Sequence, residues 1–129
     1  MANPISKNLK IGTIGELLVQ LRLLQYNIQA APPIKDSGND LIAIKKETFK
    51  TIQVKTSTKE CIKLGKLPEL FHLLALVKLN GYDDNILLDR SKIFLFKRDE
   101  ISKKNFCFSK LSKYELNKEI VCDIWGSAD

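Results

Sequence analysis

The sequence contains a single histidine, and this scarcity excludes most chemistry that depends on an imidazole. His72 lies in the apolar segment Leu-Phe-His-Leu-Leu, where a packed or rim histidine is more common than a base or a metal ligand. The cysteines form neither a C-x-x-C pair nor a cluster with the histidine, so no zinc site is predicted. Cys61, Cys107 and Cys122 are widely spaced and mostly have apolar neighbours, which favours reduced, buried thiols.

Long apolar runs are also missing. The longest, 73–77, is far too short to cross a bilayer, and the first residues lack the pattern of a signal peptide. We therefore expect no membrane partner and a soluble, cytoplasmic protein. The sequence shows no internal repeat, and 129 residues with 44% hydrophobic content are typical of a single domain, here 1–129.

Acidic residues are outnumbered by basic ones. The chain has 21 lysines and arginines against 15 aspartates and glutamates, a formal net charge of +6. This excess favours an anionic partner such as DNA, and a lysine-rich solvated surface is the alternative. The excess is concentrated in 45–66, where the candidate phosphate contacts are Lys45, Lys46, Lys59, Lys63 and Lys66.

Hydrophobic periodicity predicts the order of secondary structure. Apolar residues recur at helical spacing in 6–26, and a short extended segment at 28–31 ends at Pro32 and Pro33. A polar loop with a short helix near 68–70 is expected after residue 56, and Ser112 is expected to cap a helix at 114–120. Strands are predicted at 40–44, 50–56, 73–79 and 93–96.

The strands at 40–44 and 50–56 are expected to pair as a hairpin. Pairing Lys45 with Lys50 places Asp40 opposite Lys55. Because side chains alternate along a strand, Gln53 points to the same face. The other face is then filled by Leu41, Ala43, Ile52 and Val54. Polar groups gathered on one face of a sheet predict a functional site.

Hydrolysis of a phosphodiester uses a divalent metal held by oxygen ligands and a group that offsets charge on the phosphate. Asp40 offers a carboxylate and Gln53 an amide oxygen, and the ammonium of Lys55 can orient water or stabilise charge. One further carboxylate is needed. Glu16 is the single acid of the predicted first helix.

Two glycines precede Glu16 in that helix. Gly12 and Gly15 each destabilise a helix interior by about 1 kcal/mol relative to alanine. A glycine at such a position often marks the close approach of another backbone or of a ligand. We therefore expect the helix to make such an approach beside Glu16.

With these residues the sequence resembles the PD-(D/E)xK nuclease superfamily, which has the restriction-endonuclease fold. The resemblance covers about 9–56 and rests on Glu16, Asp40 and Gln53-Val54-Lys55. It is strongest to branches with Gln in place of the usual acid, such as Mrr-like type IV restriction enzymes and some intron-encoded homing endonucleases. The Gly38-Asn39-Asp40 segment is also similar to Mrr-like and Holliday-junction-resolvase-like members.

The resemblance implies an α/β fold with an α-β-β-β-α-β core, in which helices flank a mixed central sheet. It implies DNA cleavage that leaves 5′-phosphates, with Lys55 as the catalytic lysine and Mg²⁺, or Mn²⁺ as a substitute, as cofactor. The implied metal ligands are Glu16, Asp40, Gln53 and the backbone carbonyl of Val54. Two features depart from the pattern: no proline precedes Asp40, and Gln53 removes one negative charge. Cutting both strands would require a homodimer or a higher homo-oligomer.

Two other interpretations stay open. A nuclease-fold protein without catalysis could bind nucleic acid or a protein partner, and an unrelated α/β domain would leave the polar residues scattered. Taken singly, Asp40 can begin a strand after an Asx turn, Lys55 can be a snorkelling edge lysine, and Glu16 can be a solvated helix residue. Asp36 competes with Asp40, but we expect it to lie in the turn, outside the metal shell.

Overall fold

The computed structural model describes residues 5–34 and 38–127, so the competing aspartate Asp36 lies outside the described residues. The helices are α1 (Lys7–Leu24) and α2 (Lys118–Trp125), with short 3₁₀ turns at Arg98–Glu100, Phe108–Lys110 and Ser112–Tyr114. The strands are β1 (Gln29–Ala31), β2 (Leu41–Lys45), β3 (Thr48–Ser57), β4 (Cys61–Lys63), β5 (Leu73–Tyr82), β6 (Asn85–Lys97) and β7 (Asn105–Cys107).

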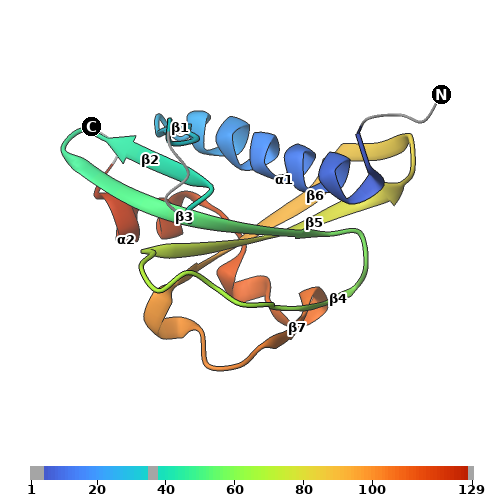
Figure 1. Ribbon diagram of the computed structural model, residues 1–129. Helices are drawn as coiled ribbons and strands as arrows, with labels where there is room; N and C mark the ends of the chain where they lie inside the picture. The colour runs from blue at the N-terminus through green and yellow to red at the C-terminus, as the bar shows by residue number, and fades with distance from the viewer. Residues whose placement is uncertain (1–4, 35–37, 128–129) are drawn as a thin grey trace.

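Helix α1 forms as predicted and lies along one face of the sheet (Figure 1). The Ser6 hydroxyl caps it by accepting a hydrogen bond from the Leu9 N–H at 3.1 Å. Asn27 adopts a positive φ of 64°, which turns the chain back toward β1. Leu18, Val19 and Leu23 are buried against the sheet. Among the described residues, no helix has the length and apolar character needed to cross a membrane.

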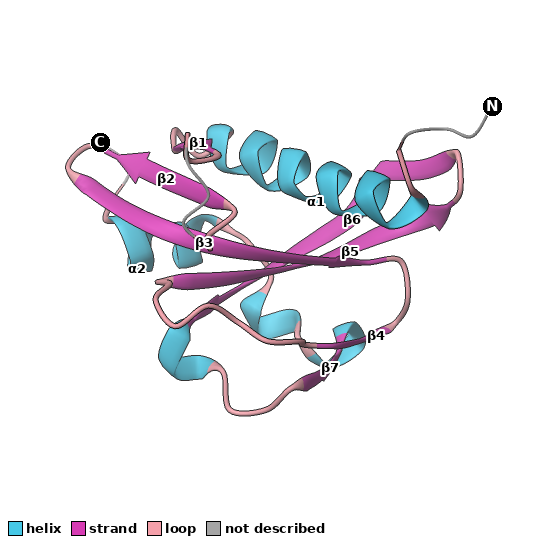
Figure 2. Cartoon of the chain, viewed as in Figure 1, coloured by secondary structure: helices cyan, strands magenta, loops and turns pink. Residues whose placement is uncertain are grey.

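A five-stranded sheet in the order β1-β2-β3-β5-β6 forms the centre of the molecule (Figure 2). The pair β3–β5 is parallel and the other neighbours are antiparallel, so the predicted mixed sheet is confirmed. The strands predicted at 73–79 and 93–96 belong to a longer hairpin of β5 and β6, and its turn is formed by Asp83 and Asp84.

The predicted hairpin of β2 and β3 is present, but its predicted register is wrong by two residues. Lys45 pairs with Thr48 and Ala43 pairs with Lys50. The turn consists of Lys46 and Glu47 alone, and Lys46 has the positive φ, 55°, that a tight hairpin turn requires. A shift of two residues keeps every side chain on its expected face. In the observed register the position opposite Asp40 is therefore Gln53 instead of Lys55.

Each face of the sheet has its own apolar core. On the α1 side, the predicted set Leu41, Ala43, Ile52 and Val54 is buried with Val121 and Trp125 of α2. The Trp125 indole N–H donates to the Ala43 carbonyl at 3.4 Å, so this residue anchors α2 against the sheet. The opposite core contains Leu64, Phe71, Leu74, Leu76, Phe94, Phe96, Phe106, Phe108 and Leu111.

The predicted helix at 68–70 is absent, the helix predicted at 114–120 is present with a later start, and the predicted α-β-β-β-α-β order is wrong. The described connection from β3 to β5 contains strand β4 and no helix, including at 68–70. Helix α2 begins four residues later than predicted, because the Asn117 carboxamide, rather than Ser112, caps it by accepting from the Ile120 N–H at 2.9 Å. Tyr114 instead stacks on Phe96, with ring centroids 4.2 Å apart.

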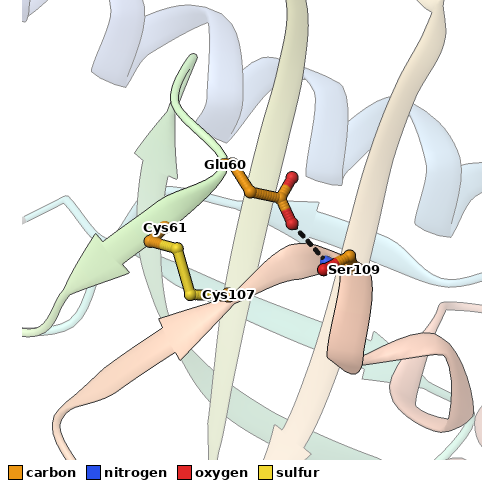
Figure 3. Close-up of a disulfide and its surroundings, with 4 residues drawn as sticks. All are labelled: Glu60, Cys61, Cys107 and Ser109. Carbon is orange, nitrogen blue, oxygen red and sulfur yellow. Dashed lines mark hydrogen bonds between the residues drawn. A yellow bond between two sulfur atoms is a disulfide. The ribbon is translucent and has the colours of Figure 1, made fainter.

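The cysteine prediction is wrong for two of the three residues. Cys61 and Cys107 form a disulfide that joins β4 to β7 (Figure 3). They are 46 residues apart in sequence and become partners only when the chain returns beside β4. Next to the disulfide, the Ser109 N–H donates to the Glu60 carboxylate at 2.7 Å, and hydrogen bonds from Ser109 lower the pKa of Glu60. Cys122 is a free thiol.

Candidate functional site

The candidate site lies where β2 ends beside β3. The last β2 pair joins Leu41 to Ile52, and the Asp40 N–H adds one backbone hydrogen bond to the Ile52 carbonyl at 3.1 Å. Two residues beyond Ile52 on β3, the Val54 N–H points to the same side of the strand and donates to the Asp40 carboxylate at 2.8 Å. A charge-assisted bond therefore holds this carboxylate at the edge of β3.

The Val54 carbonyl shares this edge. In an antiparallel pair, the N–H and C=O of one residue point to the same side of the strand. Because the Val54 N–H points toward Asp40, its carbonyl oxygen lies along the same edge of β3. The backbone thus offers an oxygen beside the aspartate, which is compatible with the ligand role implied for Val54.

Glu16 approaches the same edge from α1. The pKa of Glu16 is raised by burial and, to a smaller extent, by the charge of the Asp40 carboxyl and by side-chain hydrogen bonding with it. Two adjacent carboxyls repel each other when both are ionised, and a bound divalent cation offsets that repulsion. The structure therefore brings together the two acids that the sequence predicts to be neighbours.

A close contact between α1 and β3 positions Glu16. A Cβ atom on Gly15 would lie 1.8 Å from the Thr56 hydroxyl oxygen, so only glycine permits this approach. Gly15 is the residue before Glu16, and Thr56 is the residue after Lys55. Each of the two residues in this contact is therefore the sequence neighbour of a candidate site residue. At Gly12 a Cβ would meet no atom within 4 Å, so the expected close approach occurs at Gly15 alone.

Gln53 and Lys55 lie on the face of the sheet opposite α1. The β3–β5 register pairs Gln53 with Leu74 and Lys55 with Leu76, and both leucines belong to the second core. Gln53 is 9% exposed, and its amide oxygen has no hydrogen-bond partner among the described residues. Because buried polar atoms are normally paired, this oxygen is available to a metal ion or a water molecule.

Lys55 is half-buried, two residues beyond Gln53 on the same face. Within the described part of the chain its ammonium group forms no hydrogen bond or ion pair. An ammonium group without a hydrogen bond or ion pair among the described residues can contact an anionic oxygen such as that of a phosphate. The geometry thus leaves Lys55 free for the role that the sequence predicts.

The oxygen donors fit a hard divalent cation. Glu16 and Asp40 supply carboxylates, Gln53 an amide oxygen and Val54 a carbonyl, and such oxygens are the preferred ligands of Mg²⁺. Among the described residues no group of three or more His, Cys, Asp or Glu side chains could hold a metal. The site therefore has one carboxylate fewer than a three-acid cluster, because Gln53 is neutral.

Comparison with known proteins addresses the fold. No protein-family model matches the sequence, and no curated protein matches it significantly. Among solved structures, the chain is similar to a bacterial homing endonuclease, I-Ssp6803I, with a TM-score of 0.64 and 16% sequence identity. The match covers 85% of this chain and 86% of that one. The chain has a nuclease-like fold.

The lysines predicted to contact phosphate differ in their accessibility. The prediction for Lys45 is corrected, because it is 6% exposed and its ammonium donates to the carbonyls of Gly126 at 3.3 Å and Ser127 at 3.2 Å. Lys46 is exposed in the hairpin turn, about 20 Å from Asp40 at the rise of a strand. Lys59, Lys63 and Lys66 are exposed and follow β3 in the sequence.

His72 lies outside this site, at the start of β5. Its Nδ1 accepts a hydrogen bond from the Thr51 N–H at 2.9 Å, and the residue is exposed. The ring nitrogen thus satisfies a backbone donor on the neighbouring strand. This is the rim histidine that the sequence predicts.

We expect Glu16→Gln to stabilise the metal-free protein at neutral pH by up to about 1 kcal/mol, allowing for solvent screening of this part-exposed group. A raised pKa means that the folded state favours the protonated carboxyl of Glu16. Its contribution to stability is fully present below the ordinary pKa and is lost as the pH rises through the raised value. Glutamine removes this loss, so the two proteins should differ more as the pH rises.

Thermal unfolding with a chelator, from about pH 4 to about pH 8, measures this difference. Glu69→Gln is the control, because Glu69 is exposed in a loop and should show no such trend. Identical midpoints for Glu16→Gln and the unaltered protein at every pH would contradict the expectation.

Proposed function

We propose that this chain is a metal-dependent DNA endonuclease whose site consists of Glu16, Asp40, Gln53 and Lys55. The observation that carries the proposal is the contact of the Glu16 and Asp40 carboxyls at the edge of β3. The shared fold adds support, since the similar solved structure is that of a homing endonuclease. The proposed family is the PD-(D/E)xK superfamily, in a branch with Gln in place of the usual acid.

Each residue has a distinct role in this proposal. Glu16, Asp40, the Gln53 amide oxygen and the Val54 carbonyl would hold Mg²⁺, for which Mn²⁺ can substitute. When bound, such an ion polarises a phosphoryl oxygen and lowers the pKa of a coordinated water. The Lys55 ammonium offsets the negative charge that develops on the phosphate and orients the attacking water. The expected products carry 5′-phosphates.

DNA is the proposed substrate because the chain is basic and three exposed lysines follow β3 in the sequence. The net charge is +6, and Lys59, Lys63 and Lys66 follow β3 directly. Each phosphate contact releases counterions, so binding should weaken steeply with added salt. Cutting both strands requires two sites, and we therefore propose a homodimer or a higher homo-oligomer.

Asp40→Ala is expected to lower the rate at which supercoiled DNA is nicked in Mg²⁺ by at least about 100-fold. The substitution removes a carboxylate and also leaves the Val54 N–H without its acceptor. Calorimetry should show that the variant no longer binds Mn²⁺, whereas the unaltered chain does. Asp89→Ala is the control, since Asp89 is exposed on β6. Nicking by Asp40→Ala at the unaltered rate would refute the proposed site.

A second candidate is a nuclease-fold protein that binds nucleic acid or a protein partner without cleaving DNA. The neutral amide of Gln53, in place of an acid, favours it. Such a protein would have no reason to bind Mn²⁺ through Asp40. Calorimetry therefore separates the two: metal binding that disappears in Asp40→Ala supports the enzyme, and its absence from the unaltered chain supports the binding protein.

A further inference from the structure

Helix α1 carries a row of exposed leucines on the side that faces away from the sheet. Leu9, Leu17, Leu21 and Leu24 are 54–57% exposed. With Thr13, they recur at intervals of three or four residues and therefore share one helix face. A helix packed on one side usually presents polar residues to solvent. We call these five residues the leucine stripe. It is a second apolar face of α1, in addition to the apolar face that is buried against the sheet.

The leucine stripe is free of charge in a chain rich in lysine. Residues 11–34 contain only Glu16 and Arg22 as charged side chains, although 28% of the whole chain is charged. Glu16 bonds to Asp40, and the Arg22 guanidinium donates to the carbonyls of Leu88 at 2.9 Å and Ser91 at 3.1 Å. Depletion of charge is the signature of a protein–protein interface, and it is the opposite of what DNA binding needs.

A groove borders the leucine stripe on the side of β1. Its volume is about 310 Å³. The residues that line it are Leu17, Gln20, Leu21, Leu24, Gln29 and Ala30. Three of the six are leucines of the stripe, and none is charged. The groove therefore offers a recess for apolar side chains next to the ridge that the leucines form.

We propose that the leucine stripe is the contact between two copies of this chain, with their α1 helices antiparallel about a two-fold axis beside Leu17. The stripe is complementary to itself in that arrangement. Leu17 meets its counterpart, Leu21 lies opposite Thr13, and Leu24 lies opposite Lys10 in the turn that contains Leu9. Each copy presents a ridge of leucines and a groove that receives the other's ridge.

The charges at the end of the helix allow this contact. Lys7 and Lys10, which lie nearest the N-terminal end of the stripe, are paired with Asp83 at 3.3 Å and Asp84 at 3.0 Å. These ion pairs join α1 to the β5–β6 turn within one copy. A second copy therefore does not have to approach an unpaired ammonium group at either end of the stripe.

The test uses the full chain with Leu17 and Leu21 both replaced by Glu. Sedimentation equilibrium without metal or DNA should give twice the chain mass of 14.7 kDa for the unaltered protein. For the double variant, the dimer dissociation constant should rise by at least about 100-fold, because the contact would bury unpaired carboxylates. Both positions are more than half exposed, so the variant should fold, and circular dichroism checks this.

Leu70→Glu is the matched control, since Leu70 is 79% exposed and lies outside the leucine stripe. It should leave the dimer mass unchanged. A monomeric mass for the unaltered chain at about 100 µM, or a dimer mass for the folded double variant, would overturn the proposal. Equal weakening by Leu70→Glu would also count against it. Sedimentation equilibrium measures the mass without metal or DNA and does not depend on DNA cleavage. Its outcome is therefore independent of whether the proposed nuclease activity is found.

Discussion

Lys55→Ala is expected to lower the rate of Mg²⁺-dependent DNA nicking by about 1,000-fold while Mn²⁺ binding changes little. The ammonium of Lys55 has no hydrogen bond or ion pair within the described chain, and it lies on the same face of β3 as Gln53. Its removal therefore breaks no hydrogen bond or ion pair among the described residues. What is lost is a positive charge beside the phosphate, where stabilisation of developing charge is worth this much in rate.

Single-turnover nicking and calorimetry on the same preparations measure the two effects separately. Lys118→Ala is the control, because Lys118 is exposed at the start of α2 and should nick DNA at the unaltered rate. The expected split differs from that of Asp40→Ala, which should lose metal binding and cleavage together. If Lys55→Ala kept its nicking rate, Lys55 would be a structural edge lysine and its catalytic assignment would be wrong.

The faces of the β2–β3 hairpin could be predicted because a register error of two residues leaves each side chain on the same face of the sheet. The sequence assigns Asp40, Gln53 and Lys55 to one face, and they stay on it although the true register is two residues tighter. The position of the turn could not be predicted as easily. Lys46 adopts a positive φ without being Gly, Asn or Asp, so the usual signal of a two-residue turn is missing.

Features that depend on contacts distant in sequence were harder to predict. The disulfide forms because β7 returns beside β4, and nothing near Cys61 indicates that partner. Helix α2 starts at Lys118, after its N-cap Asn117, and Tyr114 stacks on Phe96 instead of belonging to the helix. Local propensity favours a helix both at 114–117 and at 118–120, and tertiary packing determines at which residue the helix begins. The missing helix between β3 and β5 follows the same logic, since that segment pairs as β4.

The sequence was enough to propose the residues of the candidate site, but it was not enough to predict the contacts that position them. Asp40 and Glu16 were chosen by chemistry and order, and the structure adds that they meet at the edge of β3. Thr56 was not among the predicted site residues. The one feature of the sequence that points to Thr56 is Gly15. A glycine within a helix predicts that another residue lies close to it, but it does not predict which residue. The burial of Lys45 depends on the chain end 81 residues away.

Gly15→Ala should lower the free energy of unfolding by about 2–3 kcal/mol and the midpoint of thermal unfolding by about 10 °C. The added Cβ would lie 1.8 Å from the Thr56 hydroxyl oxygen and 2.8 Å from its Cβ, so α1 and β3 must separate. Helix propensity acts in the opposite direction by about 1 kcal/mol. Because α1 carries Glu16, its displacement should also weaken Mn²⁺ binding, which calorimetry measures.

Gly12→Ala provides a control in the same helix with the opposite expected sign. A Cβ there meets no atom within 4 Å, so alanine should stabilise the protein by up to about 1 kcal/mol. Adding Thr56→Ala to Gly15→Ala removes the hydroxyl from the clash but keeps the Thr56 Cβ, so stability should return in part. Chemical denaturation of the unaltered chain, Gly15→Ala, Thr56→Ala and the double variant gives the coupling energy. Stabilisation by both glycine replacements would mean that α1 does not rest on Thr56, and Glu16 would then lose the contact that positions it beside Asp40.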